Sequence, residues 1–236
     1  MGCRCSRNCL KSSSLAVGTR LALHRRAPLC CGRRCTVDHG DSDKPSGGPV
    51  GDRPATWEDI MQLPDSLGAE IVGGKIHYRA MTRARHGSTV RELGSSLPRN
   101  GSTRAPLGWW IVNDVDVSLG SGIYVKPDLT GWRKEALPEL PDDWPVPIRP
   151  DWVCEVLSPT TAAYDRGAKA SAYAQAGVPW YWIVDPVERT VEVLELVSGR
   201  WTICGVYTDG AQLAMPPFDD TLIEVSGLFL PLKGEQ

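Results

Sequence analysis

Short periodic segments separated by turn residues run through most of the chain. Residues 56–64 have the pattern of a short helix, with Thr56 at its N-cap and Pro64 at its end. Residues 69–79 alternate between apolar and polar positions on both sides of a Gly-Gly pair, which is typical of a tight β-hairpin. Residues 86–97 place apolar side chains at helical spacing. This part of the chain is therefore predicted to form helix, hairpin and helix.

Strand patterns dominate the middle and the end of the chain. Residues 108–120 and 122–132 each read as one strand, and Pro127 makes the second a candidate for a sheet edge or a bulge. Residues 151–157 read as a strand, followed by a helix that Gly177 ends. Three later segments with short turns between them predict an antiparallel meander: 178–186, 189–197 and 200–207.

Composition divides the chain into a leader and one folded domain. At 236 residues and 42% hydrophobic, the chain can bury a sizeable core. Residues 1–40 carry eight Lys and Arg against one acid, and residues 41–54 are rich in Pro, Gly, Ser and Asp. We therefore expect residues 1–54 to form a basic, Cys-rich leader and flexible linker without fixed structure, and residues 55–236 to form the domain.

Cysteine usage points to a reducing, cytoplasmic compartment. Only Cys154 and Cys204 lie beyond the leader, so a disulfide framework for the domain is not expected. A zinc site in the leader remains an alternative, although its cysteines lack the usual spacing. No apolar run approaches the roughly 20 residues that a membrane helix requires, so we expect no membrane partner.

Glu155 is an acid inside the otherwise apolar strand pattern of residues 151–157. Alternate residues of a strand face opposite sides, and apolar residues surround this acid on both sides. An isolated ionised carboxylate there would be strongly destabilising, so a cation, a metal ion or hydrogen bonds must compensate it. The alternatives are an acid that reaches solvent at the strand end and one that pairs with a structural arginine.

Asp128 is a second acid in an apolar strand pattern, directly after a proline. Two carboxylates from two strands can hold Mg²⁺, a hard cation that prefers oxygen ligands and keeps several waters. On the helix predicted after residue 157, Asp165, Lys169 and Tyr173 form one stripe at i, i+4 and i+8. Because this helix is rich in alanine and can lie close to the sheet, we expect Lys169 to reach the acid pair.

With these motifs, residues 56–197 resemble the Uma-two group of bacterial restriction endonucleases, within the PD-(D/E)XK nuclease superfamily. The resemblance rests on AEIVGGKI, KPDL and RTVEVLEL, and on the long block CEVLSPTTAAYDRGAKASAYAQAGVPWYWIVDP. It implies an α/β (α+β) domain with a restriction-endonuclease-like fold, in which a mixed β-sheet is flanked by helices.

The resemblance also implies roles for individual residues. Asp128 matches the acid of the PD motif, and Glu155 matches the second metal-binding acid. The carbonyl group of Val156 is expected to face the metal. Leu157 stands where the superfamily has its lysine, and the family instead uses a lysine of the next helix, here Lys169.

Four further residues are weaker candidates for the site: Glu70, Asp165, Tyr173 and His86. Glu70 matches an additional acid that lies near the metal in this group. Asp165 could steer the lysine of the helix, or it could be a solvated helix acid. Tyr173 is more often a core residue in such a position, and His86 could contact phosphate, act as a base or simply lie at the surface.

These residue types indicate hydrolysis of phosphodiester bonds. Asp128 and Glu155 would hold Mg²⁺ or Mn²⁺, which withdraws charge from the scissile phosphate. Lys169 would stabilise the transition state or lower the pKa of the attacking water.

A basic segment predicts where nucleic acid would bind. Residues 75–134 carry ten Lys and Arg against four acids, and among them Arg83, Arg85 and Lys126 are candidate phosphate contacts. The alternative is that these are ordinary solubilising charges.

We therefore expect a metal-dependent endonuclease with DNA as its substrate. A homodimer is one option, because two strands of a duplex must be cut. The first alternative is an inactive nuclease-fold protein that binds nucleic acid or assists a mobile element. The second is a structural oligomerisation module that uses the aromatic strand around Trp180 and Trp182.

Overall fold

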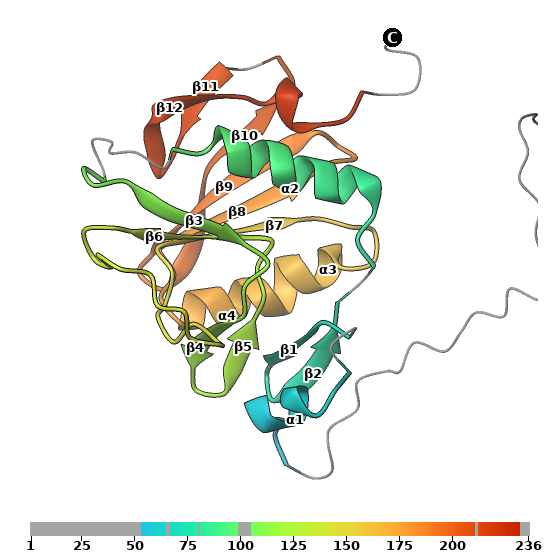
Figure 1. Cartoon of the computed structure of the whole chain (residues 1–236). Coiled ribbons are helices and arrows are strands. Elements are labelled where there is room, and N and C mark those ends of the chain that lie inside the picture. Colours follow the sequence, from blue (N-terminus) through green and yellow to red (C-terminus); the bar gives the residue numbers. More distant parts are fainter. Residues whose placement is uncertain (1–52, 65–66, 80, 99–104, 211, 232–236) are drawn as a thin grey trace, which may run out of the picture. The chain divides into compact units, whose positions relative to one another are not determined.

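The computed structural model describes residues 53–64, 67–79, 81–98, 105–210 and 212–231 (Figure 1). Residues 1–52, which hold the expected leader and most of the expected linker, lie outside the described residues, so the domain boundary at residue 54 stays a prediction. In the described part of the chain the strands form sheets of four, six and two strands.

The four-stranded sheet is built around the expected hairpin. Its strands, in the order β2-β1-β5-β4, are β2 (Lys75–Tyr78), β1 (Ala69–Val72), β5 (Ile123–Val125) and β4 (Val117–Gly120). Gly73 and Gly74 turn the hairpin with φ values of 61° and 71°, which glycine adopts at little steric cost. Before the hairpin lies α1 (Trp57–Met61), with the expected N-cap at Thr56, whose N–H donates to the Asp59 carboxylate at 2.8 Å.

The six-stranded sheet is mixed, as expected. In spatial order its strands are β10 (Arg200–Thr208), β9 (Thr190–Val197), β8 (Trp180–Asp185), β7 (Trp152–Val156), β6 (Leu129–Arg133) and β3 (Trp109–Asn113). Neighbouring strands are antiparallel except for β7 and β8, which run parallel. The predicted antiparallel meander is therefore confirmed as β8, β9 and β10.

One face of the six-stranded sheet packs against α2 (Ala84–Ser96) and the C-terminal segment (Figure 1). That segment contains β11 (Gln212–Met215), β12 (Phe218–Glu224) and the 3₁₀ turn η2 (Ser226–Leu228). The core on this face contains Leu93 of α2 together with Trp152 and Trp182 of the sheet. The predicted helix at 86–97 is thus confirmed, with a slightly earlier start.

The opposite face packs against one continuous helix. It consists of α3 (Ala162–Tyr164), the π-helical turn η1 (Asp165–Lys169) and α4 (Ala170–Gln175). The core on this face contains Ala170, Ala172 and Tyr173 of the helix together with Val153 of β7. Since Trp152, Cys154 and Val156 belong to the other core, both faces of β7 are buried, as the sequence predicted.

Two predicted strands are each broken into two. Residues 108–120 form β3 and β4 in different sheets, with a turn at Asp114 (φ 58°) between them. Residues 122–132 likewise form β5 and β6, and Pro127 lies in the break. The prediction of a sheet edge or a bulge at Pro127 was wrong, because Pro127 lies outside both strands, and β5 and β6 each have a neighbouring strand on both sides. The apolar alternation continues through both breaks, so periodicity alone could not reveal them.

Among the described residues, no helix combines the length and the hydropathy needed to cross a membrane.

Gly131 in β6 gives a test of how tightly the sheet is packed. A Cβ atom there would lie 3.0 Å from Ile111, 3.1 Å from Trp152 and 3.2 Å from Trp109, so these neighbours must shift. We expect Gly131→Ala to lower the free energy of unfolding by about 1–3 kcal/mol in urea titrations.

The matched control is Gly167→Ala, because a Cβ at Gly167 has nothing within 4 Å. In a helix this change should be neutral or stabilising, by up to about 1 kcal/mol. Equal effects of the two substitutions would contradict the packing inferred around β6.

Candidate active site

Asp128 and Glu155 lie next to each other on neighbouring strands. The antiparallel register pairs Leu129 of β6 with Cys154 of β7, so the next residues outward are Asp128 and Glu155. The backbone N–H of Val156 donates to the Asp128 Oδ2 atom at 2.8 Å, which fixes the carboxylate against β7. The sequence placed Asp128 inside a strand, whereas it precedes β6 directly.

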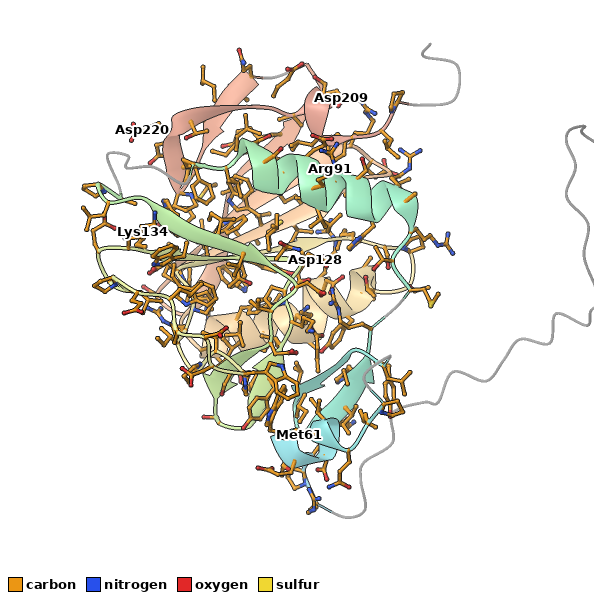
Figure 2. All side chains as sticks on the ribbon, in the orientation of Figure 1. Met61, Arg91, Asp128, Lys134, Asp209 and Asp220 are labelled. Carbon is orange, nitrogen blue, oxygen red and sulfur yellow. The ribbon has the colours of Figure 1, made fainter. Side chains whose placement is uncertain are left out.

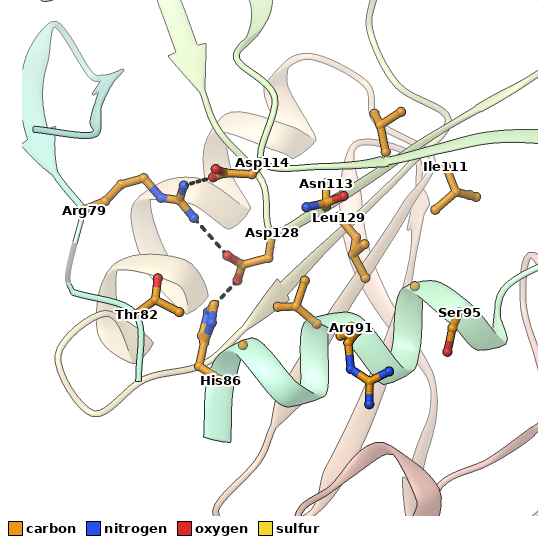
Figure 3. Close-up of a pocket in the computed structure, with 14 residues that line it drawn as sticks. Arg79, Thr82, His86, Arg91, Ser95, Ile111, Asn113, Asp114, Asp128 and Leu129 are labelled. Atoms are coloured by element: carbon orange, nitrogen blue, oxygen red, sulfur yellow. Dashed lines mark hydrogen bonds and ion pairs between the residues drawn. The ribbon is translucent and has the colours of Figure 1, made fainter. Parts of the chain in front are cut away.

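Three donors surround the Asp128 carboxylate, and Figure 3 shows two of them, Arg79 and His86. Arg79 Nη2 donates to Oδ1 at 2.9 Å, and His86 Nε2 lies 3.1 Å from Oδ2, the atom that also binds Val156 N. The carboxylate is buried, and Figure 2 marks the position of Asp128. Burial alone would raise the pKa of Asp128, but the hydrogen bond from His86 and the nearby cations outweigh it and lower the pKa.

Glu155 is compensated by a lysine and a tyrosine of the packed helix. Its Oε1 atom lies 2.6 Å from Lys169 Nζ and accepts the Tyr173 hydroxyl hydrogen at 2.6 Å. The side chain is only 4% exposed. Burial raises the pKa of Glu155 to about 8; Lys169 opposes this rise, and the charge of Asp128 adds to it. The expected compensating cation is therefore Lys169, not a structural arginine.

Lys169 joins two acids from different sheets. Its ammonium group lies 2.9 Å from Glu70 Oε1 of β1 as well as 2.6 Å from Glu155. Burial would lower the pKa of Lys169, but the charges of Glu155 and Glu70 outweigh it and raise the pKa. Glu70 Oε1 also accepts the backbone N–H of Lys126 at 2.8 Å. These positions agree with two expectations from the sequence. Lys169 was expected to reach the acid pair, and Glu70 was expected to lie near it.

The helix stripe Asp165, Lys169 and Tyr173 faces the sheet, and all three residues are buried. The stripe begins in η1 and continues into α4. A π-helical turn widens the helix locally, and such turns are frequent at functional sites. The Tyr181 hydroxyl donates to the Asp165 carbonyl at 3.0 Å, and Trp201 Nε1 donates to the Ala170 carbonyl at 2.8 Å. Burial raises the pKa of the Asp165 carboxyl to about 6. The alternative of a solvated helix acid at this position was therefore wrong.

The structure separates the three predicted nucleic-acid contacts. Arg83 lies at the edge of the acid pocket, whereas Arg85 lines neither pocket beside Asp128. The ammonium group of Lys126 lies 3.1 Å from Asp116, so its charge is already paired. Their positions therefore do not place these three side chains on one basic face.

Two residues of the site were not singled out by sequence reasoning. Arg79 follows β2 and bridges Asp128 and Asp114 (Figure 3). Tyr164 of α3 stacks on His77, with ring centroids 4.5 Å apart. Burial, followed by the charge of Glu70, raises the pKa of the Tyr164 hydroxyl. Only the basic composition around Arg79 hinted at its role.

Two pockets meet at Asp128. The smaller one contains the acids of the site with Lys169: Glu70, Asp128, Glu155 and Asp165. The larger one, of about 480 Å³, lies between α2 and the strands β3 and β6. A substrate that binds over Asp128 would therefore have room on the side of α2.

The acid pocket fits a divalent cation by its charge and by its free oxygens. Four acids line this pocket with three permanent cations, Lys169, Arg79 and the exposed Arg83. Burial, with a smaller contribution from the neighbouring carboxylates, raises the pKa values of Glu155 and Asp165. Both contacts of Glu155 lie on Oε1, so Oε2 is the oxygen that it can offer. Asp128 Oδ1 receives a single hydrogen bond and keeps a lone pair.

Among the described residues, no three His, Cys, Asp or Glu side chains converge as a ready-made metal centre. Two carboxylates suffice for an ion such as Mg²⁺, which binds one or two of them and keeps several waters. Asp128 and Glu155 are the residues that would hold it.

The sequence matches the family model Uma2, described as "Putative restriction endonuclease", over residues 57–225. The chain belongs to the Uma2 family. The resemblance of residues 56–197 to the Uma2 group is thereby confirmed. No curated protein matches the sequence.

A solved structure supports the fold of this Uma2 family member. It is described as a "putative nuclease belonging to DUF820" from Anabaena variabilis ATCC 29413, and it matches with a TM-score of 0.59 and 20% identity. The match covers 74% of this chain and 97% of the other. The expected restriction-endonuclease-like fold, a mixed sheet with helices on both faces, is confirmed.

Lys169 tests how strongly the site depends on its buried cation. Lys169→Met leaves the buried carboxylates of Glu70 and Glu155 without their ammonium partner, so we expect a loss of about 3–5 kcal/mol in the free energy of unfolding. Lys75→Met, at an exposed position of β2, should change it by less than about 0.5 kcal/mol. Similar values for both variants would show that the ammonium is not needed for stability.

The pKa of Glu155 predicts a pH dependence for the metal-free protein. Because the pKa rises from 4.5 to about 8 on folding, the folded state holds a proton that the unfolded state releases, and stability falls across that window. Glu155→Gln has no carboxyl group at this position, so it neither binds nor releases this proton. The free energy of unfolding of the variant, relative to the wild type, should therefore rise between pH 5 and 8, by at most about 1.4 kcal/mol per pH unit.

Urea titrations in EDTA at several pH values measure this difference. Above pH 8 the difference should level off, because Glu155 is then ionised in both states. A difference that stays flat between pH 5 and 8 would mean that Lys169 keeps the pKa of Glu155 at or below its ordinary value.

Proposed function

We propose that the protein is a metal-dependent endonuclease that hydrolyses phosphodiester bonds in DNA, with Mg²⁺ or Mn²⁺ as its cofactor. The observation that carries this proposal is the buried cluster of Asp128, Glu155 and Lys169 beside an open pocket, in a chain of the Uma2 family. A purely structural ion pair needs only one carboxylate and one cation. It does not explain why Asp128 lies beside Glu155, or why Glu70 and Asp165 line the same pocket.

Asp128 and Glu155 would hold the cation, which supplies an activated water and neutralises charge that builds on the scissile phosphate. Val156 orients Asp128 through its N–H, and Tyr173 orients Glu155 through its hydroxyl group. The expected metal contact through the Val156 carbonyl stays part of the proposal. These donors keep both carboxylates in place without occupying every oxygen.

Lys169 acts in this proposal first by opposing the rise in the pKa of Glu155 that burial causes, which favours the ionised carboxylate. Its ammonium lies between Glu155 and Glu70, and the raised pKa keeps it charged at neutral pH. A fixed positive charge at this point also favours the extra negative charge of a phosphoryl transition state. Asp165 adds negative potential around the ammonium, whose pKa it helps to raise.

Arg79 and His86 lie where a phosphate would approach Asp128. The side chain of Arg79 is one-quarter exposed, so it can contact a substrate while it remains close to Asp128. His86 lines both pockets, which supports a phosphate contact over a role as a surface residue.

A plasmid-nicking assay tests the proposal. The full chain should relax supercoiled DNA with Mg²⁺ or Mn²⁺ and not in EDTA. Asp128→Ala and Glu155→Ala should each lower the rate at least about 100-fold, because each removes a ligand whose charge acts in the transition state.

The matched control is Asp143→Ala, which removes an exposed acid outside both pockets. It should retain the wild-type rate. Equal activity of wild type and Asp128→Ala would point to a contaminating nuclease. Binding of DNA without cleavage by the folded wild type would instead support the inactive nuclease-fold alternative.

A further inference from the structure

The larger pocket beside Asp128 extends further than the hydrolysis of a phosphodiester bond requires. Its volume of about 480 Å³ is in the range of small-molecule sites, and it extends from Asp128 along α2 (Figure 3). It shares Arg79, Thr82, His86 and Asp128 with the acid pocket. The two pockets are therefore adjoining parts of one site.

The walls of this pocket are suited to a flat ring. One wall is the face of α2 that presents Gly87, Val90 and Gly94, where two of the three residues have no side chain. Ile111 of β3 adds a second apolar surface, and Leu129 of β6 closes the pocket where it packs against Gly94, since a Cβ at Gly94 would lie 3.3 Å from its Cδ2 atom. Apolar faces on two sides resemble the environment in which unstacked bases are bound.

A single amide provides polar recognition at one end. Asn113, the last residue of β3, lines the pocket and is exposed to solvent (Figure 3). Its side chain can donate and accept hydrogen bonds at once, as the edge of a nucleobase requires. Next to it, Asp114 holds Arg79, which also contacts Asp128.

We propose that this pocket receives the nucleoside next to the scissile phosphate, so that the enzyme acts preferentially on unpaired DNA. The inference rests on the proposed nuclease function and names its substrate class. A phosphate held near Arg79 and Asp128 places its own sugar and base at the mouth of the pocket. A base inside a duplex stack cannot enter such a cavity, so it must be single-stranded or flipped out.

Filling the pocket tests this assignment. Val90→Trp places an indole ring in the space between α2 and the strands, and Ser95→Trp does so from an exposed position of the same helix. Both should weaken binding of a fluorescent single-stranded oligonucleotide about tenfold in anisotropy titrations in EDTA, and lower kcat/KM on it by at least as much in Mg²⁺. Ser171→Trp, at an exposed position of α4, is the control and should change neither value.

The wild type should cleave the single strand about tenfold faster than the same strand in a perfect duplex. Asn113→Ala should reduce discrimination among bases at the cut site and leave melting unchanged. Equal or faster cleavage of the duplex, or unchanged binding by both folded tryptophan variants, would overturn the inference while the nuclease function stands. Preferential binding of the single strand without cleavage by the wild type would overturn the proposed function instead.

Discussion

The buried charge of Glu155 is the constraint on which the site depends. Its carboxylate lies in the middle of the six-stranded sheet, where ionisation requires a nearby cation and hydrogen bonds. Lys169 and Tyr173 of the packed helix supply them at 2.6 Å, and Glu70 of the hairpin shares the same ammonium. One ion cluster therefore connects β7, the helix that contains η1 and the four-stranded sheet.

Once Glu155 is ionised, the carboxylates of Glu155 and Glu70 place more negative charge around Lys169 than one ammonium group neutralises. Folding alone would favour removing a carboxylate, since the burial that raises the pKa of Glu155 to about 8 opposes ionisation. Keeping both Asp128 and Glu155 is reasonable if a divalent cation completes the balance. In the proposed arrangement, the phosphate reacts at the acid pocket and the nucleoside binds in the larger pocket beside α2.

Local pattern was sufficient to predict the elements around Glu155 and the partner that compensates it. The apolar period of β7 and the spacing of Asp165, Lys169 and Tyr173 place these side chains on facing surfaces without any long-range information. The strand breaks near Asp114 and Pro127 were missed because the alternation of the sequence runs through them.

Arg79 could not be assigned a partner from sequence, because Asp128 is 49 residues away and only the tertiary fold brings the two together. The direct test of the account is anomalous diffraction from crystals containing Mn²⁺. A single strong peak about 2.1 Å from carboxylate oxygens of both Asp128 and Glu155 is the predicted result. A peak bound by neither acid, or none at saturating Mn²⁺ above pH 8, would contradict it.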